Sequence, residues 1–260
     1  MSGGGEGSGG NTSSKNSNLR LRVISALVLG PAVLLIAWFG GIAFTVLALA
    51  VAILFLFEWL DITGNLSAFQ VASIGYAALG LIALAFYLGE PGYAVAMPFI
   101  GAAIAFVMGG VREGGRWAGA GVLYAGLSLY ALIAIRNGAL GLEFLFFLLI
   151  AIWATDIAAY FTGRALGGPK LWPRVSPKKT WSGALGGLAA AAILGTAAAW
   201  TFGQQNLVAY AVLAVILSIA SQLGDMLESA VKRRFDVKDS SQLIPGHGGI
   251  MDRVDGLVAA

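Results

Sequence analysis

The sequence contains no cysteine and a single histidine, His247, and only 11% of its residues are charged. The absence of cysteine excludes disulfide bonds, thiolate metal sites and cysteine nucleophiles, and one histidine excludes histidine-rich metal clusters. Apolar residues make up 58% of the 260 residues, and the mean hydropathy is +0.82. Because this balance is far from that of a soluble globular domain, we expect lipid to surround most of the chain.

Runs of about 20 apolar residues, the length that crosses the hydrocarbon core, predict an all-α polytopic bundle of about eight spans. We expect a ninth span to begin at Leu257, three residues before the last residue of the sequence, Ala260. Residues 1–18 are almost entirely Gly, Ser, Asn and Thr, which predicts a disordered cytoplasmic tail. We place the eight spans near residues 22–39, 41–57, 69–88, 94–110, 119–135, 141–163, 184–202 and 207–224.

The positions of the basic residues predict the orientation of these spans. If the tail is cytoplasmic, all of the 16 Lys and Arg residues except Arg136 fall in segments on the cytoplasmic side. We therefore expect N-terminal transmembrane helices over 19–140 and a catalytic region over 141–260. Two polar cytoplasmic loops, at 164–183 and 225–256, are its functional candidates.

The first candidate region combines a carboxylate with hydroxyl and ammonium groups. Asp156 lies inside the sixth span, about two turns from its cytoplasmic end, where a carboxylate is costly unless it is paired or binds a metal. Ser176, Lys178, Lys179 and Thr180 precede the seventh span, and a helix N-terminus favours phosphate. The alternatives are a structural partner for a basic residue at Asp156 and membrane-surface anchoring by the basic loop.

The second candidate region continues directly from the eighth span. If the helix extends beyond the membrane, Asp225, Glu228, Ser229 and Lys232 share one face. Two carboxylates there suit Mg²⁺, which is commonly held by one or two carboxylates together with substrate phosphates. The alternative is an ordinary exposed ion pair between Glu228 and Lys232.

A glycine-rich segment follows at 245–256. Its glycines permit backbone conformations that aim N–H groups at an anion. Asp252 and Asp255 repeat the i, i+3 spacing of carboxylates, and Arg253 offers a planar fork for phosphate oxygens. His247 could donate a hydrogen bond to a phosphate or relay a proton.

Residues 229–239 read S-x-x-K-R-x-x-x-x-K-D and residues 245–255 read P-x-H-G-G-x-x-D-R-x-D. This pattern resembles the signature of the phosphatidate cytidylyltransferase, or CDP-diacylglycerol synthase, family. The motifs T-D at 155–156, S-P-K-K-T at 176–180 and G-D-x-x-E-S at 224–229 resemble the same family. The detailed resemblance covers about residues 150 to 256.

The resemblance implies transfer of CMP from CTP to phosphatidic acid, with release of pyrophosphate and a requirement for Mg²⁺ or another divalent metal. It also favours a homodimer. We expect the protein in the bacterial inner membrane, with the active site at the cytoplasmic face and no nucleic-acid partner. Relatives usually continue into a final span beyond the Asp-Arg-x-Asp segment. The expected catalytic residues are Asp225, Asp252, Asp255, Lys232, Arg253 and His247. The expected metal ligands are Asp156, Asp225, Glu228, Asp252 and Asp255, and the expected substrate-binding residues are Ser176, Lys178, Lys179, Thr180, Ser229, Arg233, Lys238, Gly248 and Gly249.

Two other functions are compatible with parts of the sequence. A lipid transporter or flippase would carry charges at mid-membrane and related sequence halves, whereas the polar residues here gather at one face. A polyprenol or phytol kinase would also use a nucleotide at the membrane, but it would release a nucleoside diphosphate instead of pyrophosphate.

Overall fold

The computed structural model describes residues 27–110, 113–243 and 248–260. Within them, seven helical segments are long and apolar enough to cross a membrane, and a shorter apolar helix covers Leu27–Phe39. These segments correspond to the predicted spans, so the all-α bundle is confirmed. The predicted tail and the start of the first span lie outside the described residues. The spanning segments are α2 (Gly41–Ile62), α3 (Phe69–Tyr87), α4 (Pro91–Ala94) with α5 (Met97–Met108), α6 (Glu113–Asn137), α7 (Gly141–Leu166), α8 (Trp181–Thr201) and α9 (Leu207–Arg234).

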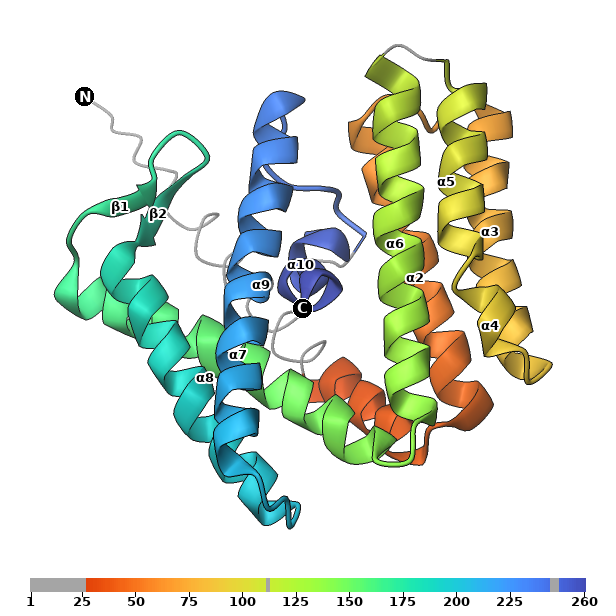
Figure 1. The fold of residues 1–260 in the computed structure, drawn as a ribbon. Coiled ribbons are helices and arrows are strands. Elements are labelled where there is room, and N and C mark those ends of the chain that lie inside the picture. The colour runs from red at the N-terminus through yellow and green to blue at the C-terminus, as the bar shows by residue number, and fades with distance from the viewer. Residues whose placement is uncertain (1–26, 111–112, 244–247) are drawn as a thin grey trace, which may run out of the picture.

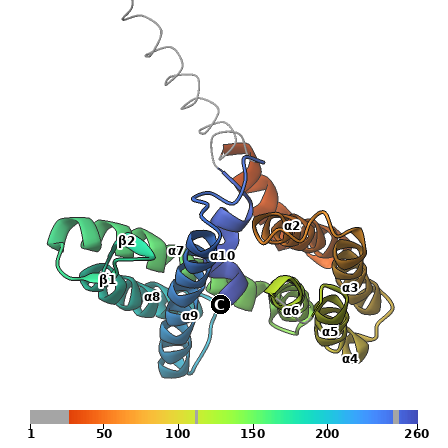
Figure 2. The ribbon, with the colours of Figure 1, turned by 90° about the horizontal axis from the view of Figure 1, so that it is seen from above.

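The helices form two groups that flank a short helix, α10 (Met251–Ala259) (Figures 1 and 2). One group contains α2, α3, α5 and α6, and the other contains α7, α8 and α9. Helix α10 packs mainly on α9 and also contacts α2, α6 and α7. It therefore joins the two groups of helices.

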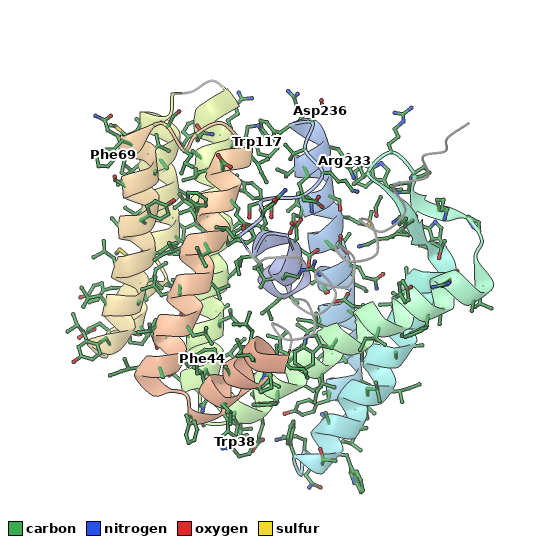
Figure 3. The ribbon with its side chains drawn as sticks, turned by 180° about the vertical axis from the view of Figure 1, so that it is seen from behind. Trp38, Phe44, Phe69, Trp117, Arg233 and Asp236 are labelled. Carbon is green, nitrogen blue, oxygen red and sulfur yellow. The ribbon has the colours of Figure 1, made fainter. Side chains whose placement is uncertain are left out.

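Each group has its own apolar core. The larger core lies among α2, α3, α5 and α6 and also takes in Met251 of α10, whereas the smaller one includes Phe147 of α7 and Ala214 of α9. Small residues bring α7 and α8 together, since a Cβ at Gly183 would lie 2.7 Å from the Ala159 carbonyl oxygen. Apolar side chains such as Phe69 point outward from the bundle (Figure 3), where we expect lipid.

Arg136, the one basic residue predicted on the opposite side, lies in the last turn of α6. Its guanidinium donates hydrogen bonds to the carbonyl oxygens of Ala37 at 2.8 Å and Trp38 at 2.7 Å. These carbonyls end the helix Leu27–Phe39, where a cation is favoured by the helix dipole. Arg136 thus ties this helix to α6.

The predicted loop at 164–183 is largely structured. Helix α7 runs to Leu166, and strands β1 (Lys170–Trp172) and β2 (Ser176–Thr180) then pair antiparallel, with Lys170 opposite Thr180. Thr180 caps α8, because its Oγ1 accepts a hydrogen bond from the Gly183 N–H at 3.1 Å. This hairpin was not predicted from the sequence.

The predicted loop at 225–256 also contains helix at both ends. Helix α9 continues to Arg234 without an interruption, and α10 begins at Met251. No proline or glycine follows Gly224 until the helix has ended, so the helix extends beyond the apolar segment. Asp225, Glu228, Ser229 and Lys232 therefore lie on α9, as the sequence analysis assumed.

Candidate active site

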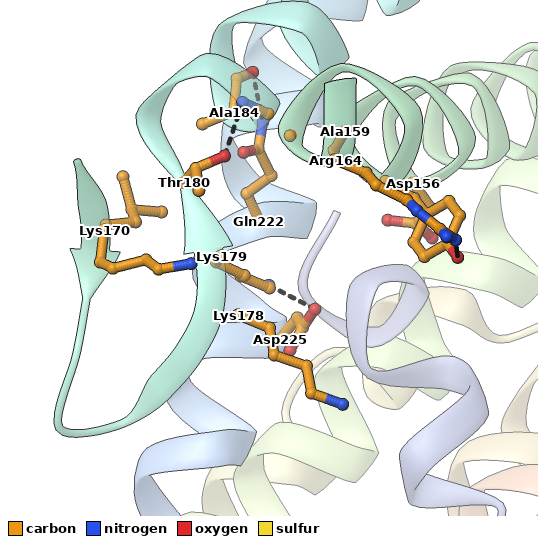
Figure 4. A pocket seen from close by; sticks show the side chains of 14 residues that line it. Asp156, Ala159, Arg164, Lys170, Lys178, Lys179, Thr180, Ala184, Gln222 and Asp225 are labelled. Atoms are coloured by element: carbon orange, nitrogen blue, oxygen red, sulfur yellow. Dashed lines mark hydrogen bonds and ion pairs between the residues drawn. The ribbon is translucent and has the colours of Figure 1, made fainter. Parts of the chain in front are cut away.

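A cavity of about 530 Å³ opens between α7, the β1–β2 hairpin, α8 and α9 (Figure 4). Its walls include five residues that the sequence analysis selected, from three separate segments. Arg164, Lys170 and Gln222 also line it and were not selected as site residues. The five predicted residues are Asp156, Lys178, Lys179, Thr180 and Asp225.

The cavity brings cations and carboxylates together. The Lys179 ammonium forms an ion pair with the Asp225 carboxylate, and both side chains are about one-third exposed, at 29% and 33%. The Arg164 guanidinium donates a hydrogen bond to the Tyr160 hydroxyl at 3.0 Å, which holds it at the rim (Figure 4). With Lys170 and Lys178, the cavity carries four basic side chains, a composition suited to the negative charge of phosphate groups.

Asp255 of α10 lies close to the acidic side of this cavity. Burial raises the pKa of its carboxyl group, and the negative charges of Asp225 and Asp156 also raise it. The hydrogen bond from the Gly256 N–H and the charge of Lys179 lower it, and the resulting pKa is about 7. Asp156, Asp225 and Asp255 come from α7, α9 and α10. Three helices thus direct carboxylates toward one region.

These carboxylates have the donor chemistry that Mg²⁺ prefers, which is hard oxygen. Within residues 27–110, 113–243 and 248–260, however, no three acidic or histidine side chains are close enough to hold one ion as they stand. The Lys179 ammonium currently bonds Asp225. A divalent ion therefore fits these residues by donor type, and binding it would require the side chains to close around it.

A second network lies beside the first on α9 and α10. The Lys232 ammonium contacts the Glu228 Oε1 at 2.8 Å and the Asp252 Oδ1 at 2.6 Å. The Asp252 Oδ2 accepts hydrogen bonds from the N–H groups of Ser240 at 3.0 Å and Gly249 at 3.1 Å. Burial alone would raise the pKa of Asp252, but the Lys232, Ser240 and Gly249 hydrogen bonds outweigh it and lower the pKa. Glu228 and Asp252, both predicted metal ligands, are engaged here with Lys232.

In the described part of the glycine-rich segment, from Gly248 onward, backbone N–H groups donate to protein carboxylates. Its backbone N–H groups were predicted to face an anion, and in the structure the Gly249 N–H faces Asp252. The N–H groups of Ile250 and Met251 face Glu58 at 2.9 and 2.8 Å. A Cβ at Gly249 would lie only 1.9 Å from the Ser240 Oγ, so only glycine fits there.

Glu58 of α2 was missed by the sequence analysis. It is fully buried in a helix that is otherwise apolar along most of its length. The sequence nevertheless contains a signal for Glu58. A carboxylate at the end of an apolar run is costly to bury, which is the reason that Asp156 was selected.

The remaining predicted residues do not line the cavity. Ser229 lies one turn after Asp225 on α9 and donates a hydrogen bond to the Asp225 Oδ1 at 3.4 Å. Ser176 begins β2 opposite Trp172, and Arg233 donates to the Val237 carbonyl oxygen at 3.1 Å near the end of α9 (Figure 3). Lys238 and Arg253 are exposed, and His247 lies outside the described residues. A Cβ at Gly248 would lie 3.1 Å from the Asp252 Oδ2.

The fold and the site together define a polytopic membrane protein in which a basic cavity adjoins a group of helix-borne carboxylates. The chain belongs to the cytidylyltransferase family, whose model matches residues 20–260. The phosphatidate cytidylyltransferase of Brucella suis is 44% identical over 246 residues, which cover 94% of this chain and 91% of that protein. The enzymes of the same name from Bacillus subtilis and Haemophilus influenzae are 45% identical over 137 residues and 47% identical over 129 residues. These matches cover 51% and 46% of this chain, and 50% and 43% of the respective relatives. The family predicted from the sequence motifs is confirmed.

Proposed function

We propose that this protein transfers CMP from CTP to phosphatidic acid, giving CDP-diacylglycerol and pyrophosphate. The observation that carries the proposal is the basic cavity beside Asp156 and Asp225, in a chain that is 44% identical to a phosphatidate cytidylyltransferase over nearly its whole length. In the reaction, a phosphate oxygen of phosphatidic acid forms a bond to the α-phosphorus of CTP. The bond from that phosphorus to the departing pyrophosphate oxygen breaks, so no enzyme nucleophile is needed.

The basic residues of the cavity would bind the phosphate oxygens. Arg164, Lys170 and Lys178 come from the end of α7 and the two strands, and their charges offset the repulsion between the two substrates. Lys179 is positioned by Asp225 and could turn to a phosphate when that carboxylate takes another partner.

The acidic residues would hold a divalent metal. We assign Asp156, Asp225 and Asp255 as its ligands, because they approach the cavity from three helices. Bound Mg²⁺ would neutralise charge on the triphosphate and on the departing pyrophosphate. Glu228 and Asp252 would orient Lys232, and the predicted roles of His247, Arg253, Ser176, Arg233 and Lys238 stay predictions.

We also propose that the cavity faces the cytoplasm of a bacterial cell. The distribution of basic residues supports this orientation. The C-terminal ends of α2 and α9 lie on the same side of the bundle as the hairpin (Figure 1). A phosphatidic acid molecule keeps its acyl chains in lipid, so its phosphate reaches a site only at the headgroup level. The homodimer implied by the family resemblance stays a prediction.

The test is pyrophosphate release by detergent-purified protein given CTP, phosphatidic acid and Mg²⁺. Each component is omitted in turn, and ATP replaces CTP in one sample. We expect release only when all three are present and none with ATP. Asp225→Asn should lower the rate by about 100-fold or more, whereas Asp61→Asn, at an exposed carboxylate near the end of α2, should leave the rate unchanged. Release of a nucleoside diphosphate, or full activity of Asp225→Asn, would overturn the proposal.

A further inference from the structure

Glu58 is the buried acidic side chain of α2, a helix whose other buried residues are apolar. Its exposed fraction is 0%. A buried carboxylate is retained in a folded protein only when hydrogen bonds or charges compensate for its lost hydration. The hydrogen-bond partners of Glu58 therefore indicate its role.

Four donors surround the two oxygens of Glu58, and all come from the other end of the chain. Oε1 accepts hydrogen bonds from the Ser241 hydroxyl at 2.6 Å and the Ile250 N–H at 2.9 Å. Oε2 accepts from the Ser240 hydroxyl at 2.8 Å and the Met251 N–H at 2.8 Å. A single side chain of the N-terminal group thus holds both ends of the segment from Ser240 to Met251.

The same segment holds Asp252. The Ser240 Oγ lies 2.8 Å from Glu58 Oε2 and 2.9 Å from Asp252 Oδ2, so one hydroxyl sits between the two carboxylates. Met251, which precedes Asp252, is fully buried in the core of the N-terminal helices. The start of α10 is therefore fixed to α2, and the direction of α10 sets where Asp252 and Asp255 lie.

We propose that Glu58 is a positioning residue for nucleotidyl transfer, which anchors the start of α10 and so holds Asp252 against Lys232 and Asp255 toward the cavity. This inference rests on the proposed function. Glu58 does not line the cavity. It acts through the segment that it binds.

The first experiment tests whether Glu58 anchors the start of α10, and it does not depend on enzyme activity. Because the natural chain has no cysteine, a single Met251→Cys thiol reports whether the start of α10 is docked. Glu58→Gln keeps the size of the side chain but turns an NH₂ group toward donors that need an acceptor. We expect thiol labelling at position 251 to become about tenfold faster or more, the effect of losing a hydrogen bond to a charged group.

Two controls separate local release from general damage. Ala199→Cys, at a fully buried site in α8, should label slowly in both backgrounds. Glu143→Gln alters the carboxylate that accepts a hydrogen bond from Gln204 at 2.7 Å in the other helix group, and it should leave labelling at 251 unchanged. Equal acceleration at 251 and 199, or no acceleration at 251, would overturn the proposal.

The second experiment separates positioning from substrate binding. We expect Glu58→Gln to lower kcat by about 100-fold, since small displacements of reacting groups cost this much. The KM for CTP should stay within about twofold, because Lys178 and Lys179 lie on β2, which is not part of the segment that Glu58 binds. Glu58→Asp, which keeps the charge, should recover part of kcat. A normal kcat in Glu58→Gln, or a change confined to KM, would refute the positioning role.

The two experiments fail in different ways if the proposals are wrong. A wild-type protein that releases no pyrophosphate would overturn the proposed function. The labelling measurement would still decide whether Glu58 anchors α10.

Discussion

Lys232 provides a direct test of the paired network on α9 and α10. Its ammonium lies between two carboxylates, 2.8 Å from Glu228 and 2.6 Å from Asp252, and only 13% of its side chain is exposed. At an effective dielectric constant of about 20, unit charges at such distances attract by about 6 kcal/mol. Desolvation offsets much of this attraction, but removing one partner of a buried pair typically costs about 3–5 kcal/mol.

We therefore expect Lys232→Met to lower the free energy of unfolding by about 3 kcal/mol. The substitution keeps most of the side-chain volume and leaves Glu228 and Asp252 facing each other without a cation. Adding Glu228→Gln to this variant removes the uncompensated charge and should recover about half of the loss, since Asp252 keeps its hydrogen bonds from Ser240 and Gly249.

The assay is unfolding of the detergent-solubilised protein by increasing dodecyl sulfate, followed by tryptophan fluorescence. Lys238→Met, at an exposed lysine, is the matched control and should change the free energy by less than about 0.5 kcal/mol. A loss below about 1 kcal/mol for Lys232→Met, the value of a surface ion pair, would refute the reasoning. So would the absence of any recovery in the double variant.

Three further outcomes can be measured in the same way. Gly249→Ala should lower the free energy of unfolding by about 1–3 kcal/mol, because a Cβ there would lie 2.4 Å from the Glu58 Oε2. The control is Gly80→Ala, where no atom lies within 4 Å of the added Cβ, and it should not lower the free energy of unfolding. Arg136→Ala should cost about 1–3 kcal/mol by leaving the two helix-end carbonyls without their donor, while pyrophosphate release by the folded fraction stays normal. Thr180→Val should lower the free energy of unfolding by about 1 kcal/mol through loss of the α8 cap. Thr180→Ser keeps the hydroxyl and should retain most of the wild-type stability. An equal loss in both variants would contradict the capping role.

Much of the fold could be predicted because, in a membrane protein, the length of each apolar run indicates where a helix spans the bilayer. The segments at 41–57 and 69–88 were found from hydropathy alone and correspond to α2 and α3. Some residues that line the cavity were selected from the sequence for a related reason. A carboxylate such as Asp156 within an apolar helix is conspicuous, and it does line the cavity beside Lys179.

The hairpin at 170–180 could not be predicted in the same way. Its strands are three and five residues long, and their pairing depends on a turn that carries no alternating apolar pattern. The sequence analysis ended the eighth span at 224 and left open whether its helix continues, because hydropathy reports where the apolar segment ends and not where the helix ends. Helix α9 continues to Arg234.

The sequence by itself determined the membrane environment of the chain, the order of its apolar helices within the described residues, and its family. These follow from local composition and from motif spacing, which need no knowledge of distant contacts. Only the tertiary structure decided which carboxylates lie near one another. Asp225 and Asp255 lie 30 positions apart and face one region with Asp156, whereas Asp252 pairs with Lys232 and is held through Glu58, 194 positions earlier. Such pairings depend on how the helices cross and where α10 docks, and no local pattern in the sequence encodes those directions.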